Sequence, residues 1–245
     1  MKKLSSVFQY IIAGGLFLGL FVFIFTNVTD NPRYHLILDS PNLLLKGLWN
    51  TLISSILTLF FSMILGFILY LMVRSKIPFI KAIAVIFKEI VMGTPLLVMV
   101  FLAVYVLGNF TGIENKFVLG IIALTLYMAP YLSNAYESAV KIIDDEQYTV
   151  MNLYHFSSFQ KYRYIIFPQM VRPLMPSLIN NLSTVIKGSA LLKVVSIAEI
   201  SYVISAISAE NWASVEGYLI MWLAYLIITI PLSILAQVIG RRLTR

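Results

Sequence analysis

Long apolar runs, separated by short polar segments, make up most of the chain. Five of the runs carry no charge and one is more polar; in order they cover residues 4–29, 47–73, 90–113, 117–136, 172–209 and 217–240. Each run is long enough to cross a hydrocarbon core of about 30 Å as a helix. The pattern therefore predicts an all-α, polytopic membrane protein with six transmembrane helices.

The first run follows Met1-Lys2-Lys3 and has two interpretations, a cleaved signal peptide or a retained anchor. It is longer than the apolar region of most signal peptides, and no A-x-A-like cleavage site precedes Asp30. We therefore expect a retained anchor. The polar residues 30–46 that follow, with Pro32 and Pro41 as helix breakers, are expected to form an external loop.

Two of the runs contain prolines that predict an interruption. Met92-Gly93-Thr94-Pro95 lies in the third run, where proline removes a backbone donor and the flanking residues can relax the freed groups. Pro130 lies inside the fourth run. We expect a break at each position.

The longest polar interruption is Asp144 to Gln169. Asp144 and Asp145 can cap a first short helix, and Ser157 with Gln160 has the spacing of a capping box for a second. Pro168 is expected to end that second helix. The segment also carries seven aromatic residues: Tyr148, Tyr154, Phe156, Phe159, Tyr162, Tyr164 and Phe167. So much apolar surface indicates either docking onto a partner or a segment that lies on the membrane surface.

Composition agrees with a membrane protein, since 60% of the 245 residues are hydrophobic and 12% are charged. The absence of cysteine excludes disulfides and Cys-ligated metals. The net charge is +7, but no basic run with interleaved aromatics occurs. We therefore expect membrane lipid and not nucleic acid as a partner.

The distribution of cations predicts the orientation. If the N-terminus is inside, three Lys and Arg side chains fall in outer loops and twelve fall on the inner side. The twelve are Lys2, Lys3, Arg74, Lys76, Lys81, Lys141, Lys161, Arg163, Arg172, Arg241, Arg242 and Arg245. The positive-inside rule then predicts both termini, and the Asp144 to Gln169 segment, in the cytoplasm.

Charged side chains inside spans are costly and mark candidate functional positions. Glu89 and Lys187 each lie beside a motif that breaks a helix, so a functional and a structural role are equally favoured for them. Three other charged residues lie near span ends or have no supporting motif: Lys88, Glu137 and Lys193. For these, pairing with another helix or snorkelling to the membrane surface is the favoured explanation. Glu199 is a further candidate.

No catalytic constellation is apparent. His35 and His155 fall in loops on opposite sides of the membrane, so we expect no metal site and no nucleophile, base and orienter set. A G-x-x-x-x-G-K-[ST] motif is also absent. We therefore expect a transporter subunit and not an enzyme, with any ATP hydrolysis in a separate subunit.

Five segments match, in order and spacing, the motifs of one family. Residues 47–52 read G-L-W-N-T-L, residues 89–97 read E-I-V-M-G-T-P-L-L, residues 145–169 end in P-Q, residues 187–191 read K-G-S-A-L, and Glu199 follows. Together they resemble the membrane subunit of type I bacterial ABC importers for polar amino acids, whose cytoplasmic segment is called the EAA loop. The likeness covers roughly Gly47 to Gly240.

The resemblance implies a five-helix core preceded by one extra helix. Residues 1–46 would form the anchor and external loop, and residues 47–245 the transmembrane domain with its coupling loop at residues 141–170. It also implies a second permease subunit, a dimer of cytoplasmic ABC ATPases that binds ATP and magnesium, and an extracytoplasmic amino acid binding protein. This chain would bind no cofactor itself and would lie in the bacterial cell membrane.

The first short helix of the loop would be the coupling helix, which sits in a groove of the ATPase. ATPase closure on ATP would rock the spans from inward to outward access as rigid bodies. The residues expected at this contact are Gln147, Tyr148, Thr149, Met151, Tyr154, His155 and Phe156, with the buried surface centred on Tyr148, Met151, Tyr154 and Phe156.

The chain departs from the family at charged positions. Met92 stands where arginine is usual, and the A-E-x-x-R pattern of the fourth span appears with Asn134 and Glu137 in place of its two charges. Where the loop usually reads G-Q-x-E-A-A with a later G, this chain has Glu146-Gln147-Tyr148-Thr149-Val150-Met151 and then His155, so the acidic residue and both alanines are gone. We therefore expect this chain to be the divergent member of a heterodimeric pair of permeases.

An amino acid zwitterion needs an anion near its ammonium and donors near its carboxylate. Glu89 is expected to supply the first, and Lys187 or backbone N–H groups near Gly93 and Gly188 the second. The expected pathway set is Glu89, Gly93, Thr94, Asn134, Lys187, Gly188 and Ser189. The alternatives are a permease for another small polar solute, or an ATP-independent small carrier or channel.

Overall fold

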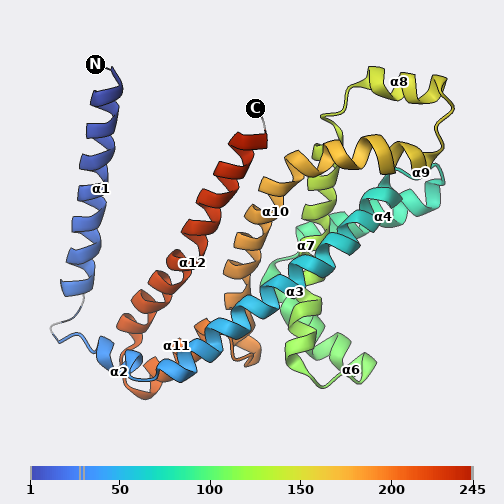
Figure 1. Cartoon of the computed structure of the whole chain (residues 1–245). Helices are drawn as coiled ribbons and strands as arrows, with labels where there is room; N and C mark the ends of the chain where they lie inside the picture. The colour runs from blue at the N-terminus through green and yellow to red at the C-terminus, as the bar shows by residue number, and fades with distance from the viewer. Residues whose placement is uncertain (1, 28, 30, 244–245) are drawn as a thin grey trace.

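The computed structural model describes residues 2–27, 29 and 31–243, and it confirms the all-α prediction (Figure 1). The first half of the chain forms α1 (Lys2–Asn27), α2 (Tyr34–Leu38), α3 (Pro41–Val73), α4 (Pro78–Gly93), α5 (Leu96–Phe101), the π-helical η1 (Leu102–Leu107) and α6 (Gly108–Thr111). The second half forms α7 (Lys116–Val140), α8 (Asp145–Leu153), α9 (Ser158–Gln160), the π-helical η2 (Lys161–Ile166), α10 (Phe167–Ser189), the 3₁₀-helical η3 (Ala190–Val195), α11 (Ile200–Glu210) and α12 (Ser214–Leu243).

Three helices among the described residues, α3, α7 and α12, are each long and apolar enough to cross a membrane. Two further spans are broken: α4 with α5–α6, bent by 109°, and Ser158–Val195 with α11, bent by 49°. The described part of the chain thus holds up to five spans, and α1 adds a shorter apolar helix over Ile11–Asn27. The first bend confirms the break predicted at Gly93-Thr94-Pro95.

The helices α3 and α7 pack closely because α3 presents small residues to α7. A Cβ on Gly66 would lie 2.8 Å from the Cβ of Leu132 and 2.9 Å from the carbonyl oxygen of Ala129. Small buried side chains continue along α3: Thr51, Ser54, Ser55, Thr58 and Ser62. Close backbone approach through small residues is the usual way in which membrane helices associate.

Pro130 does not interrupt its helix, and the sequence prediction of a break there is wrong. The helix α7 runs from Lys116 to Val140 with Pro130 buried inside it. Gly66 of α3 lies directly against the adjoining residues Ala129 and Leu132. Neighbouring helices can hold a proline-containing turn helical in this way.

Pro168 does not end a helix either. The predicted caps are confirmed, because the Asp144 side chain accepts a hydrogen bond from the Glu146 N–H, and Ser157 and Gln160 form a capping box. From Ser158, however, the chain stays helical through η2 into α10, with Pro168 in the first turn of α10. The wider π turn just before Pro168 makes room for the proline ring.

Residues 30–46 contain more helix than the predicted external loop, since they include α2 and the first turns of α3.

Next to these residues, the end of α1 carries an aromatic cluster. Ring centroids of Phe21 and Phe25 lie 5.0 and 6.5 Å from that of Trp222 on α12, and Phe25 lies 5.7 Å from Tyr34 on α2. Figure 1 shows α1 standing apart from α12 over the rest of its length.

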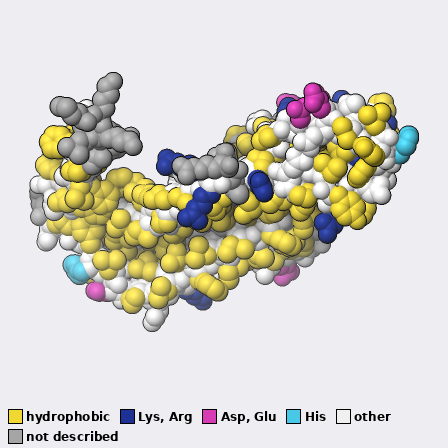
Figure 2. All heavy atoms as spheres, turned by 45° about the horizontal axis from the view of Figure 1, so that its top comes forward, with side chains coloured by type: hydrophobic (Ala, Val, Ile, Leu, Met, Phe, Trp, Pro, Cys, Tyr) yellow, Lys and Arg dark blue, Asp and Glu magenta, His cyan; other side chains and the backbone are white. Residues whose placement is uncertain are grey.

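A broad hydrophobic belt covers the long helices in the view of Figure 2. Acidic side chains gather at the end of the molecule that carries α8, whose first turn holds Asp145 and Glu146. The belt is the surface expected of helices that lie in lipid.

Candidate functional site

The helix α8 is held against the bundle by its own apolar side. Met151 is 1% exposed and belongs to a buried cluster with Tyr136, Ile166 and Met170. Two further residues predicted for the coupling contact, Tyr148 and Phe156, are partly buried against the same cluster. These three side chains therefore anchor the helix; Met151 is fully covered, whereas Tyr148 and Phe156 keep part of their surface exposed.

The other side of α8 is exposed. Leu153 and Tyr154 are 72% and 74% exposed, Val150 is 49% exposed, and Thr149 is exposed beside them. His155 is also exposed and adopts a left-handed backbone, φ 52°, directly after the helix. Sequence reasoning missed Val150 and Leu153, although they stand one turn apart, at the spacing that places two side chains on one helix face.

Two glutamines join α8 to α10. Gln147 Nε2 lies 3.3 Å from Gln169 Oε1, and Gln169 Nε2 lies 2.8 Å from Gln147 Oε1. Beneath them, the Arg74 guanidinium donates to the Tyr70 hydroxyl at 3.2 Å, and that hydroxyl lies 3.4 Å from the hydroxyl of Tyr162 in η2. Burial in this setting raises the pKa of the Tyr148 hydroxyl above its ordinary value.

At the break between α4 and α5, two residues that depart from the family pattern touch each other. Asn134 Nδ2 on α7 lies 3.9 Å from Met92 Sδ on α4, and Asn134 Oδ1 accepts a hydrogen bond of 2.7 Å from Lys88 Nζ. The Val91 carbonyl, which loses its helical donor to Pro95, accepts from the Thr94 N–H at 3.1 Å, and the Ile90 carbonyl oxygen accepts from Thr94 Oγ1 at 2.6 Å. Glu89 and Gly93 are exposed.

The Gly188-Ser189-Ala190 motif lies close to the break between α4 and α5, although the chain stays helical through this motif into η3 and bends only after Val195. A Cβ on Gly188 would lie 3.1 Å from Cδ2 of Leu96, the first residue of α5, so the end of α10 passes close to the break after Thr94. Ser189 is buried and donates to the Ile186 carbonyl oxygen at 2.8 Å, while Lys187 is exposed. The structure thus brings the Gly188 region and the Thr94–Pro95 region together.

Three of the intramembrane charges have partners in the described structure. Lys141 Nζ lies 2.9 Å from a carboxylate oxygen of Glu137, and Lys193 Nζ lies 5.3 Å from the ring centroid of Tyr218. Lys88 binds Asn134, as above. The geometry of these residues therefore supports the structural role that the sequence favoured for them, which is pairing with neighbouring groups.

The buried side chain of Glu199 links α11 to α12 and α3. Its side chain is 0% exposed and caps α11 by accepting from the N–H groups of Ser201 and Tyr202 at 3.0 and 2.8 Å. It also accepts from the hydroxyls of Ser201, Tyr225 and Thr51, which tie α11 to α12 and α3. Buried charge is tolerated when donors surround it in this way.

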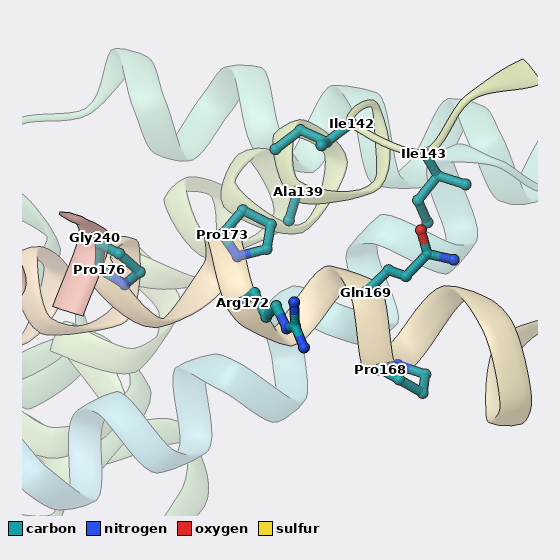
Figure 3. Close-up of a pocket in the computed structure, with 9 residues that line it drawn as sticks. All are labelled: Ala139, Ile142, Ile143, Pro168, Gln169, Arg172, Pro173, Pro176 and Gly240. Carbon is teal, nitrogen blue, oxygen red and sulfur yellow. The ribbon is translucent and has the colours of Figure 1, made fainter. Parts of the chain in front are cut away.

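A cavity of about 680 Å³ lies between the ends of α7, α10 and α12, next to the base of α8 (Figure 3). Its polar lining comes from Gln169 and Arg172 of α10. In Figure 3 the Gln169 side chain reaches from α10 toward Ile143, and Arg172 lies between Gln169 and Pro173. Sequence reasoning did not place either residue in a site.

Comparison with known proteins adds a family to this geometry. Residues 62–245 match the family model described as "Binding-protein-dependent transport system inner membrane component". The chain is 25% identical over 210 residues to the probable glutamine ABC transporter permease protein GlnM of Bacillus subtilis, covering 86% of this chain and 97% of that relative. It is 30% identical over 196 residues to the probable amino-acid ABC transporter permease protein PatM of Vibrio harveyi, covering 78% and 87%.

A solved structure is also similar. A chain in the crystal structure of "an amino acid ABC transporter with histidines" superposes with a TM-score of 0.78 at 25% identity, covering 86% of this chain and 99% of that chain. The overall helical arrangement of this chain is therefore similar to that of a chain in an amino acid ABC transporter.

Proposed function

The chain belongs to the family of binding-protein-dependent transport system inner membrane components, and from this membership we propose that it is the permease subunit of an ATP-driven importer of a polar amino acid. One observation carries the choice of solute. The similarity extends over 97% of a probable glutamine ABC transporter permease and over 99% of a chain from an amino acid ABC transporter, which supports an amino acid as the solute. The alternative substrate is another small polar solute.

We assign the contact with the ATPase dimer to the exposed side of α8. Val150, Leu153, Tyr154 and the exposed His155 form a mainly apolar surface outside the spans, which an aqueous groove on a partner would cover. Met151, Tyr148 and Phe156 support this surface from below. ATP and magnesium would bind on the ATPase, and movement of α8 would reach the spans through the buried cluster and the Gln147–Gln169 pair.

We assign the solute path to the region where the end of α10 meets the break between α4 and α5. Glu89, Gly93 and Thr94 lie at this break and Lys187, Gly188 and Ser189 at the end of α10, and the Gly188–Leu96 contact joins the two. Interrupted helices of this kind present backbone groups and helix ends to a polar solute. An extracytoplasmic binding protein would deliver the amino acid at the opposite end from α8.

We propose that both termini are cytoplasmic, with residues 1–46 as anchor and external loop and residues 47–245 as the transmembrane domain. Support comes from the sequence, in which twelve Lys and Arg side chains fall in the segments predicted to be inside and three in those predicted to be outside. The coupling loop, residues 141–170, would then face the ATPases inside the cell.

We propose further that the second permease is an unlike subunit. Met92 and Asn134, which replace two charges usual in the family, are in contact, so the two departures form one neutral pair. Both substitutions therefore alter the same contact between α4 and α7, as expected if this chain is the specialised member of a pair of permeases. Full transport by this chain with its ATPase and binding protein alone would refute this part of the proposal.

The decisive experiment is reconstitution of the co-purified complex with its binding protein, followed by a screen of the common amino acids for stimulated ATP hydrolysis and uptake. We expect stimulation by a polar amino acid that requires the ATPase subunits. Uptake that persists without any ATPase would replace the proposal with an ATP-independent carrier. Stimulation only by solutes other than amino acids would reassign the substrate.

A further inference from the structure

The helix α10 carries a continuous polar stripe. Its exposed polar side chains recur at intervals of three to eight residues along one side of the helix. Pro173 and Pro176 lie in the longest interval, which separates Arg172 from Asn180. The polar residues are Gln169, Arg172, Asn180, Thr184 and Lys187. At about 100° per residue these positions fall within one side of the helix. The opposite side, with Leu174, Leu178 and Val185, is buried in the bundle.

Three members of the stripe have no partner for their side chains in the described part of the chain. Arg172, Lys187 and the side-chain amide of Asn180 make no hydrogen bond or ion pair there. Thr184 Oγ1 donates only to the backbone carbonyl of Asn180, at 3.1 Å. Unpaired cations and amides facing hydrocarbon are strongly disfavoured, so we expect this side of α10 not to face lipid.

The stripe leads into the cavity at the base of α8. Gln169, Arg172, Pro173 and Pro176 line that cavity, whose volume of about 680 Å³ is in the range of small-molecule sites. At the other end, Lys187 precedes Gly188, which lies against the break between α4 and α5. One face of one helix therefore connects the break between α4 and α5 with a cavity at the α8 end.

The charge of the stripe has one sign. The helix α10 contains Arg172 and Lys187 and no acidic residue. The two cations are separated by fifteen residues, which corresponds to about 22 Å along a helix. Between them lie an amide and a hydroxyl, which can donate to an anion but hold it more weakly than a cation does.

We propose that this stripe is a wall of the water-filled transport path and that it passes the carboxylate group of the solute from Lys187 to Arg172. The inference rests on the proposed import function and adds to it the chemical group that is recognised along the path. Weak neutral donors between two cations let the carboxylate leave each site, as conduction requires. The path thus favours solutes with a free carboxylate and disfavours purely cationic ones.

Cysteine accessibility tests the wall without knowledge of the solute. The chain has no cysteine, so N180C and T184C each introduce a unique thiol in this subunit. Within the assembled complex, we expect both thiols to react with methanethiosulfonates, and the anionic sulfonatoethyl reagent to react faster than the cationic trimethylammonium reagent. The double variants N180C/K187Q and N180C/R172Q should lose that preference.

The matched control is I227C on α12. Ile227 is 64% exposed and apolar, and its neighbour Ile228 shares a small cavity with Leu182 and Ile186 of α10, which places it at a similar depth. We expect no reaction at this lipid-facing thiol. Protection of N180C and T184C from both reagents in an assembled complex, or a faster reaction with the cationic reagent, would overturn the proposal.

Uptake measurements test the carboxylate transfer itself. We expect K187Q and R172Q each to lower uptake of the transported amino acid about tenfold or more, as loss of a hydrogen bond to a charged group predicts. K187R should restore most of the loss, and K81Q, at an exposed cation on α4, should leave uptake unchanged. Unchanged uptake in both K187Q and R172Q would refute the transfer. The thiol reactivities test the water-filled wall even if the solute is not an amino acid. Failure of this inference can therefore be distinguished from failure of the proposed import function.

Discussion

Gln147 on α8 and Gln169 on α10 exchange side-chain amide hydrogen bonds of 3.3 and 2.8 Å. The pair joins the short helix α8 to the long helix α10, whose polar stripe begins at Gln169. Gln169 Nε2 also donates to the Ile165 carbonyl oxygen at 3.1 Å, which orients its side chain on α10. In the proposed mechanism, movement of α8 would therefore be transmitted to α10 by direct hydrogen bonds as well as by apolar packing.

Replacing Gln147 or Gln169 with Ala should weaken this transmission. Both side chains are at least partly exposed, so we expect a cost to folding of only about 1 kcal/mol. Uptake per ATP hydrolysed should fall about fivefold, as loss of a modest coupling free energy predicts. Q237A, at an exposed glutamine of α12, is the control. An unchanged ratio of uptake to hydrolysis in Q147A and Q169A would contradict the role of the pair.

Met151→Ala and Leu153→Ala should separate anchoring from docking. Met151 is 1% exposed, so its truncation should destabilise the segment by about 2–5 kcal/mol and raise its susceptibility to proteolysis. Leu153 is 72% exposed, so L153A should change stability by less than about 0.5 kcal/mol but weaken retention of the ATPase on purification. If L153A retained the ATPase as well as the unaltered chain does, the assigned contact would be wrong.

Glu199→Gln should destabilise the junction of α3, α11 and α12. The substitution puts an amide NH₂ among donors that now point at a carboxylate, and loss of charge-assisted bonds costs about 1.5–3 kcal/mol. Thermal unfolding of the purified complex measures the loss. Y225F, which removes one donor, should cost less, and E210Q at the exposed end of α11 should be neutral. Equal melting temperatures for E199Q and E210Q would refute the role of Glu199 in holding α3, α11 and α12 together.

Gly66→Ala tests the α3–α7 contact. Its Cβ would lie 2.8 Å from the Cβ of Leu132, which requires the helices to move apart, so we expect a cost of about 1–3 kcal/mol. The control is G19A on α1, where a Cβ would meet nothing within 4 Å. A melting temperature for G66A at or above that of the unaltered chain would show that α3 and α7 pack less tightly than described.

Glu89→Gln tests the assigned ammonium site. Glu89 is exposed beside the break after Gly93, and a neutral amide cannot replace its charge. If Glu89 binds the ammonium, E89Q should abolish uptake while leaving assembly with the ATPase intact. E114Q, at an exposed glutamate near the turn between α6 and α7, is the control. Normal uptake by E89Q would remove Glu89 from the path.

The sequence by itself determined the features that depend on local interactions or on the solvent. The helical class and the apolar runs follow from the need to satisfy backbone groups inside lipid. The caps at Asp144 and at Ser157 with Gln160 are confirmed, because a cap joins residues only two or three positions apart. The break at Gly93-Thr94-Pro95 is confirmed for the same reason: proline removes a donor wherever it stands.

Only the tertiary structure decided what depends on neighbours distant in sequence. Pro130 and Pro168 are as disruptive locally as Pro95, yet packing against Gly66 and the π turn η2 keep both inside continuous helices. The loop's aromatic content indicated docking, but contacts from Tyr136 and Ile166 decided that Met151 faces inward and Leu153 outward. Side-chain burial is a property of the whole bundle, and a short amphipathic helix can turn either face to it until the other helices are in place.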